Sequence, residues 1–143
     1  MMSALNIDAA RTIIRETLAK SHEMGLKPMS VIVLDAGGHP LAFEREDGAA
    51  PGRYAIAEGK AYGAVMLGMP GSAQMARAEA QHYFMTAANG AFGGKVVPVP
   101  GGVIVRGADG AILGAVGVTG DTSDNDAAAA LAGIEAAGLK GDA

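Results

Sequence analysis

Arg45 is the first residue whose type and position suit chemistry. It follows Leu41 and Phe43 at alternate positions of an extended segment, so it lies at the end of a stripe that faces the core. A guanidinium at the edge of a core can hold a carboxylate through two parallel hydrogen bonds. A structural salt bridge with Asp35 or Glu58 is the alternative. The position therefore predicts either a catalytic anchor for a carboxylate substrate or an internal ion pair.

Lys60 is the second candidate for chemistry. It shares a helical stripe with Ile56, Gly63 and Leu67, and this spacing predicts a half-buried side chain. A buried lysine requires a partner or has a lowered pKa, and both situations occur in active sites. The alternative is an ammonium group that reaches water while its methylene chain packs on the core. We interpret Lys60 as a candidate catalytic acid or base, with Arg45 as the group that anchors the substrate.

A glycine-rich strand end is expected to hold the ligand next to these two cations. Asp109-Gly110 is a strong hairpin signal and is compatible with a type I′ turn. Counting outward from this turn pairs Gly102 with Gly117, which leaves the open end of the hairpin as nearly bare backbone. Free N–H groups beside two cations suit a carboxylate. The predicted ligand-binding residues are Gly101, Gly102, Gly117 and Thr119 of this hairpin and Asp35 of the preceding one.

Two hairpins and the helices around them must position these residues. Apolar runs and alternating stretches predict the strands, and apolar residues at helical spacing predict the helices. The strands do not alternate singly with helices, which disfavours a doubly wound parallel sheet and favours an antiparallel one. Gly59 and Gly63, four apart on one helix, imply close approach of the sheet or of a second subunit. The predicted order is a helix from Asn6 to Gly25, strands 30–35 and 41–46, helices 53–67 and 72–88, strands 103–108 and 111–118, and a helix that Ser123 caps and that ends near Gly138.

Length, composition and charge restrict the class of protein. The 143 residues fit one domain, residues 1–143, with a core of small aliphatic side chains because only 4% of the residues are aromatic. A net charge of −4 without any basic run predicts neither a nucleic-acid partner nor a membrane partner. Cysteine is absent, which excludes thiol catalysis and thiolate metal sites. The sequence shows no secretion signal and no long apolar stretch, so the expected location is the cytoplasm.

Several short motifs carry a family resemblance through their order and spacing. They are Val33–Gly38, Arg45–Gly48, Glu58–Ala61, Pro100–Val105 and Leu113–Gly120, followed by Asp124 and Asp126. Together they resemble the GlcG/HbpS-like heme-binding family, whose fold also forms the C-terminal domain of PduO-type cobalamin adenosyltransferases. Val103 stands where the family often has proline, and Thr119 replaces the usual serine but keeps the hydroxyl. Residues 80–99 also differ from the family pattern, and ligand specificity is expected to diverge there.

The resemblance implies an α+β fold with profilin-like α-β-α layers, in which two β-hairpins build a four- to five-stranded antiparallel sheet. It also implies homo-oligomeric assembly and, for some members, heme binding. His82 then becomes the candidate ligand for the heme iron, because Tyr83–Met85 beside it form an aromatic and apolar concentration, and an axial ligand needs an apolar wall. His22 near a helix end and His39 in a turn are the alternatives. Each histidine is also compatible with an ordinary surface or packed position.

Three functions are compatible with this sequence. The one we favour is a module that binds heme or a related tetrapyrrole and acts as a sensor, carrier or accessory protein. The second is an isomerase, lyase or hydrolase of a carboxylate metabolite in a catabolic pathway, with Arg45 and Lys60 as its catalytic residues. The third is a structural accessory subunit in which Gly59 and Gly63 serve assembly alone. The expected partners are a small molecule that carries a carboxylate and further copies of the chain, in a dimer or larger oligomer.

Overall fold

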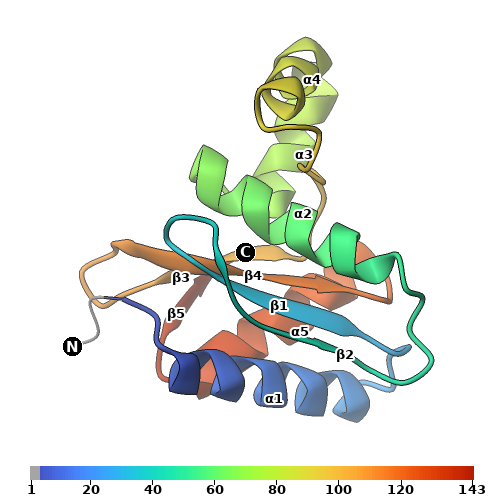
Figure 1. Ribbon diagram of the computed structural model, residues 1–143, viewed down its shortest axis with the longest axis vertical. Helices are drawn as coiled ribbons and strands as arrows, with labels where there is room; N and C mark the ends of the chain where they lie inside the picture. Colours follow the sequence, from blue (N-terminus) through green and yellow to red (C-terminus); the bar gives the residue numbers. More distant parts are fainter. Residues whose placement is uncertain (1–3) are drawn as a thin grey trace.

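The computed structural model describes residues 4–143 as five helices and a five-stranded sheet (Figure 1). The strands are hydrogen-bonded in the order β2-β1-β4-β3-β5, and every neighbouring pair is antiparallel. This confirms the predicted α+β class and its antiparallel sheet. The elements are α1 Ile7–Glu23, β1 Ser30–Asp35, β2 Pro40–Arg45, α2 Arg53–Leu67, α3 Gly71–Ala80, α4 His82–Ala91, β3 Gly102–Arg106, β4 Ile112–Thr119, α5 Ser123–Ala136 and β5 Lys140–Asp142.

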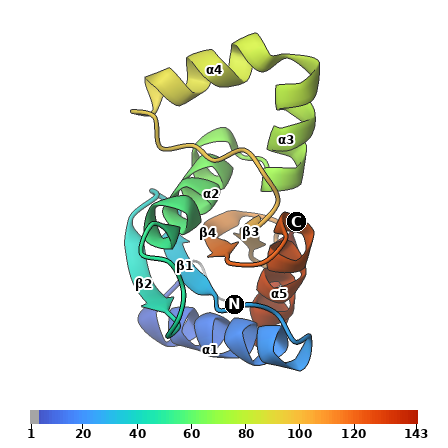
Figure 2. The ribbon, with the colours of Figure 1, turned by 90° about the vertical axis from the view of Figure 1, so that its right-hand side faces the viewer.

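The sheet separates two layers of helices. Helix α2 lies across one face, α1 and α5 cover the other, and α3 and α4 project beyond α2 as an arm (Figures 1 and 2). Successive residues of a strand point to opposite faces, so the buried strand β1 contributes to two apolar cores. Val31 and Val33 pack with α1 and α5, whereas Ile32 and Leu34 pack with the alanines of α2. Within residues 4–143, no helix is long and apolar enough to cross a membrane.

The hairpin formed by β3 and β4 has the predicted register at its open end, whereas the register shifts by one residue between Val105 and Arg106, next to the turn. Gly102 is the partner of Gly117, and β4 is buried along most of its length because it lies between β1 and β3. The predicted order contains no strand after the helix that ends near Gly138, but the short strand β5 follows it and pairs with β3 at the edge of the sheet. Arg106 Nη2 holds this strand through Asp142 Oδ2 at a distance of 2.9 Å. A polar strand of three residues shows no alternation of hydrophobicity, so the sequence pattern could not reveal it.

The turn between β3 and β4 differs from the predicted type I′ turn. Gly110 has a φ of +83°, but Asp109 does not adopt the left-handed conformation that a type I′ turn requires at both central positions. The Gly110 N–H donates to the Gly107 carbonyl, and the Gly107 N–H donates to the Ala111 carbonyl. This is the three-residue loop in which a left-handed glycine follows a type I turn. The first hairpin repeats it, with Gly38 at a φ of +85°.

The predicted helix 72–88 is two helices. The chain breaks at Gln81, whose φ of −142° and ψ of 65° lie outside the helical range. Its N–H still donates to the Arg77 carbonyl and closes the last turn of α3. Neither glycine nor proline marks the break, so the sequence carries no local signal for it. The change of direction brings Met85 of α4 into a buried position on the arm.

Candidate functional site

The Lys60 side chain is 3% exposed and forms an ion pair inside the protein. Its Nζ lies 3.0 Å from Asp126 Oδ2 and donates to the Val118 carbonyl, also at 3.0 Å. Burial lowers the pKa of Lys60, and the Asp126 carboxylate opposes that shift. Asp126 lies in the first turn of α5, which Thr122 caps in place of the predicted Ser123. Two of the three ammonium donors therefore link α2 to β4 and α5.

The glycines at the open end of the β3–β4 hairpin are covered by α2. A Cβ added at Gly102 would overlap the Lys60 carbonyl, and one added at Gly117 would overlap the Ala57 carbonyl. Gly101 is buried as well, and its φ of +116° favours glycine. The expected open backbone is therefore not found, because these glycines allow α2 to pack closely on the sheet. A ligand-binding role for them stays a prediction.

Thr119 has a partner that we did not predict from the sequence. Arg53, the first residue of α2, donates from Nη1 to Thr119 Oγ1 over 2.7 Å. The basic residue at the start of a helix near a polar strand end is the only signal that the sequence offers for this contact. Arg45 is exposed at the end of β2, and no carboxylate within residues 4–143 forms an ion pair with it. Neither the salt bridge to Asp35 nor the one to Glu58 is formed.

Asp35 stabilises the turn of the first hairpin. Its Oδ1 accepts from the backbone N–H groups of Gly37 and His39 at 2.9 and 3.0 Å, and His39 Nδ1 lies 3.3 Å away. The hydrogen bond from the His39 N–H is the main cause of the lowered pKa of Asp35. Asp35 and Arg45 lie at opposite ends of the β1–β2 register. The structure therefore does not bring these two predicted site residues together.

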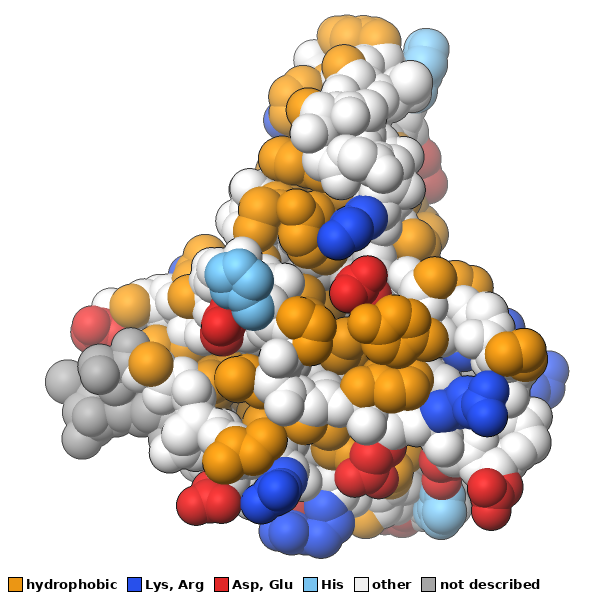
Figure 3. Space-filling model, in the orientation of Figure 1, with side chains coloured by type: hydrophobic (Ala, Val, Ile, Leu, Met, Phe, Trp, Pro, Cys, Tyr) orange, Lys and Arg blue, Asp and Glu red, His pale blue; other side chains and the backbone are white. Residues whose placement is uncertain are grey.

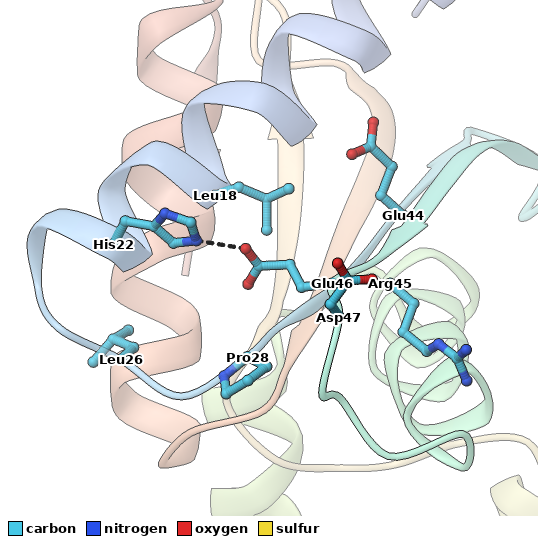
Figure 4. A pocket seen from close by; sticks show the side chains of 8 residues that line it. All are labelled: Leu18, His22, Leu26, Pro28, Glu44, Arg45, Glu46 and Asp47. Carbon is cyan, nitrogen blue, oxygen red and sulfur yellow. Dashed lines mark hydrogen bonds and ion pairs between the residues drawn. The ribbon is translucent and has the colours of Figure 1, made fainter.

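A cavity of about 600 Å³ lies where α1 ends beside β2 (Figure 4). His22 Nε2 is 2.5 Å from Glu46 Oε2, and Glu46 Oε1 accepts from the Met29 N–H. Arg45 belongs to the lining, but its side chain points away from His22 and Glu46 in Figure 4. The cavity is acidic on balance, since its lining includes three carboxylate side chains and one guanidinium. Its other lining residues are Leu18, Leu26, Pro28, Glu44 and Asp47.

A second cavity, of about 260 Å³, lies on the arm beside the predicted iron ligand. His82 begins α4 and is exposed, whereas Met85 and Val96 form the buried part of the wall. Asn89 Oδ1 accepts from the Val96 N–H at 2.9 Å, which ties the segment before β3 to α4. We name this site the arm cavity and define it by its lining residues, which are Ala78, His82, Met85, Thr86, Asn89, Val96 and Pro98.

The wall of the arm cavity is aliphatic, not aromatic as we predicted. Tyr83 presents its ring to His82 at a centroid distance of 5.9 Å, but it is 63% exposed and does not line the cavity. The Phe84 ring lies under the Arg77 guanidinium, 4.1 Å from its Cζ. The helical spacing placed these aromatic residues on one helix with His82, yet it did not place them on one face.

Gly59 and Gly63 contact other parts of the same chain. A Cβ added at Gly59 would overlap the Lys95 carbonyl, and one added at Gly63 would lie 2.6 Å from Gln74 Oε1. The Val97 N–H also donates to the Gly59 carbonyl at 3.2 Å. This stripe therefore packs against α3 and the segment that leads to β3, and leaves no room for a second subunit there. The predicted homo-oligomer loses this basis and stays a prediction.

The chain is similar to known proteins along nearly its whole length. A family model described as "Haem degrading protein HbpS-like" matches residues 5–135. A double mutant of HbpS from Streptomyces reticuli is 29% identical, with 94% of this chain and 88% of that chain covered and a TM-score of 0.78. A comparison with curated protein sequences found no match.

Two further solved structures share the fold at lower identity. The complex of PduOC with heme is 22% identical, with 98% of this chain and 99% of that chain covered and a TM-score of 0.85. Klebsiella pneumoniae protein ORFY is 22% identical, with 96% of this chain and 93% of that chain covered and a TM-score of 0.85. These two likenesses show the fold alone, whereas the family model covers most of the sequence. The chain therefore belongs to the HbpS-like family.

Proposed function

We propose that this protein binds heme in the arm cavity, with His82 as the side chain that contacts the iron. The observation that carries the proposal is that His82 lines an apolar cavity and has no carboxylate partner within residues 4–143. The other two histidines each face a carboxylate, His22 that of Glu46 and His39 that of Asp35. Axial ligation of heme iron uses a free imidazole nitrogen in an apolar setting. A bound heme would supply an iron centre for ligand or electron exchange.

The lining of the arm cavity suits one edge of a porphyrin. Met85, Val96 and Pro98 supply aliphatic surface, and a methionine side chain adapts to an irregular ligand edge. A volume of about 260 Å³ holds only part of the macrocycle, so we expect the propionates to reach solvent. The family description and the heme complex of PduOC also support a tetrapyrrole ligand.

We favour binding, in a sensor, carrier or accessory role, over catalysis by Lys60. A general acid or base must reach the substrate proton within hydrogen-bond distance. The Lys60 ammonium is enclosed and already donates to Asp126 and Val118. An enzyme that uses it on a carboxylate metabolite would first have to open this ion pair. Arg45 is exposed and remains suited to anchoring an anion.

We also propose a homo-oligomer in the cytoplasm. Several large apolar side chains are exposed, Tyr83 among them, and a second copy would cover part of this surface. The absence of cysteine is compatible with a reducing compartment. Light scattering is expected to give the mass of a dimer or larger species at micromolar concentration, and a monomer would contradict the proposal.

Titration of the purified protein with hemin tests the main proposal. We expect a Soret band that saturates near one heme per chain, and a shifted and weaker band for His82→Ala. His22→Ala and His39→Ala serve as matched controls, since each removes an exposed imidazole elsewhere, and both should bind like the wild type. Loss of the band in His22→Ala alone would instead place the heme in the cavity between α1 and β2. Identical spectra for all three variants would show that no histidine ligates the iron.

A further inference from the structure

Three strands end in a row of polar side chains beneath the first turn of α2. Arg45 of β2 is the partner of Ser30 of β1, and Ser30 is the partner of Thr119 of β4. Alternation along β2 puts Arg45 on the same face as Phe43, whose ring packs edge-on against Tyr54 of α2 at 4.8 Å. The row Arg45–Ser30–Thr119 therefore faces α2. Neighbouring strands are about 4.8 Å apart, so the row spans only about 10 Å.

A second guanidinium joins this row from above. Arg53 Nη1 donates to Thr119 Oγ1, and within residues 4–143 neither Arg53 nor Arg45 forms an ion pair. The nearby Asp126 carboxylate is already paired with Lys60. In Figure 4 the Arg45 side chain points away from the carboxylates of the cavity between α1 and β2. Figure 3, in the orientation of Figure 1, shows Lys or Arg side chains on the right, at the end of the molecule where α2 begins.

The start of α2 adds further unused hydrogen-bond donors. Its first turn contains no acidic residue, and Gly52 at the cap position supplies no side-chain acceptor. Among the described residues, nothing accepts from the N–H groups of Tyr54 and Ala55. The N-terminal end of a helix attracts anions through such free N–H groups and the aligned peptide dipoles.

Ser30 provides an independent sign of an absent ligand. Its side chain is fully buried in the middle of the row, yet its Oγ has no hydrogen-bond partner within residues 4–143. A buried hydroxyl without a partner is costly and uncommon, and it calls for an explanation. An anion or an anion-bound water that reaches the row between the two arginines would satisfy it.

We propose that Arg45 and Arg53, together with the Ser30 and Thr119 hydroxyls and the first turn of α2, bind a small oxyanion. Two guanidinium groups beside free N–H donors suit a carboxylate or a phosphate, both of which accept paired hydrogen bonds. The arm follows the other end of α2, so this site is separate from the arm cavity (Figure 2). It uses the predicted anion anchor Arg45, but with Arg53 in place of Lys60 as the second cation.

Calorimetric titration at low ionic strength, with malonate in one arm and inorganic phosphate in the other, tests this site. We expect at least one of the two anions to bind with one-to-one stoichiometry, and the tighter one identifies the ligand class. Arg45→Gln and Arg53→Gln should each weaken that binding by roughly 10- to 100-fold, as for loss of a charged hydrogen bond. Ser30→Ala should weaken it by a smaller factor.

Arg15→Gln is the matched control, because Arg15 is an exposed arginine on α1, on the other side of the sheet. It should leave the affinity within about twofold of the wild type, as expected for a surface charge. Because Arg45 is exposed, its replacement should leave the fold intact. Arg45→Gln therefore tests the site even if Arg53→Gln fails to fold. The proposal is overturned if neither anion binds, or if Arg15→Gln and Arg45→Gln weaken binding equally.

Discussion

Lys60 Nζ lies 3.0 Å from Asp126 Oδ2, and the side chains of both residues are almost completely shielded from water. The contact joins the middle of α2 to the first turn of α5, at the end of β4 between them. Desolvation of both charges opposes this arrangement, and attraction between them and the hydrogen bond to the Val118 carbonyl offset it. The pair therefore holds together elements that belong to opposite layers of the fold.

Replacing Lys60 by methionine should destabilise the protein by about 3–5 kcal/mol, because it leaves the Asp126 carboxylate buried without a partner. The double variant Lys60→Met with Asp126→Leu should recover much of that loss. Lys20→Met, which removes a half-buried lysine of α1 from its surface ion pair with Glu23, is the control and should cost less than about 1 kcal/mol. Urea unfolding measures all three. A single variant as stable as the control would show that the pair is open to water in solution.

Adding a methyl group at Gly102 or Gly117 should also destabilise the fold, by about 1–3 kcal/mol or more, because the backbone of α2 must move away. Gly90→Ala is the opposite case, since nothing lies within 4 Å of the added carbon on the exposed side of α4. It should stabilise the protein by about 0.5–1 kcal/mol through helix propensity. If Gly102→Ala or Gly117→Ala unfolded at as high a temperature as Gly90→Ala, the close packing of α2 on these glycines would be contradicted.

Local patterns were sufficient to predict most of the fold. Alternating and helical spacing indicated both hairpins and most of the helices, and counting from Asp109 and Gly110 gave the observed pairing of Gly102 with Gly117. The count agrees because the register shift between Val105 and Arg106 offsets the extra residue of the three-residue loop. These features depend on residues close together in the sequence. The break at Gln81 was missed because no glycine or proline marks it, and β5 was missed because its three residues show no alternation of hydrophobicity.

The candidate site was harder to predict, because it depends on contacts between distant segments. Residue types alone suggested that Lys60 and the glycines were available to a ligand. In the structure, α2 packs so closely on the sheet that Lys60 and these glycines shield one another from a ligand. The contact between Arg53 and Thr119 spans 66 positions, and no local pattern encodes it. Arg45 lies on the same face of β2 as Phe43, as predicted, but it is exposed and forms neither of the two predicted ion pairs.

Acid should weaken the protein through Asp121. Its carboxylate accepts hydrogen bonds from the Asn125 side chain and from the Thr122 and Lys27 N–H groups, which lower its pKa from 3.8 to about 2. Because the folded-state pKa is the lower one, this stabilisation is present above about pH 4 and is lost as the pH falls toward 2. Urea midpoints across this range should fall less steeply for Asp121→Asn than for the wild type.

Asp47→Asn is the control for this measurement, since Asp47 is exposed and accepts no hydrogen bond from the described residues. Its urea midpoint should follow the same pH dependence as that of the wild type. An Asp121→Asn variant with an unchanged pH profile would show that these hydrogen bonds do not persist in solution.

Asn89→Ala should weaken hemin binding by roughly fivefold, the effect of losing about 1 kcal/mol of hydrogen bonding. The amide oxygen of Asn89 holds the Val96 N–H, so its removal frees one wall of the arm cavity. Thr86→Ala alters the same lining without removing a hydrogen bond between described residues, and it should bind hemin like the wild type. Equal affinities for Asn89→Ala and Thr86→Ala would show that this wall is not part of the binding site.

The location of the tetrapyrrole is tested most directly by NMR of the isotope-labelled protein with zinc protoporphyrin, a diamagnetic analogue of heme that accepts one axial ligand. We predict that the largest amide shifts occur in α4 and at Val96, with the His82 ring signals shifted most, and that the amide shifts are much smaller in His82→Ala. Shifts confined to the end of α1 and to β2, or no shifts at a ratio of one porphyrin per chain, would contradict the proposed site.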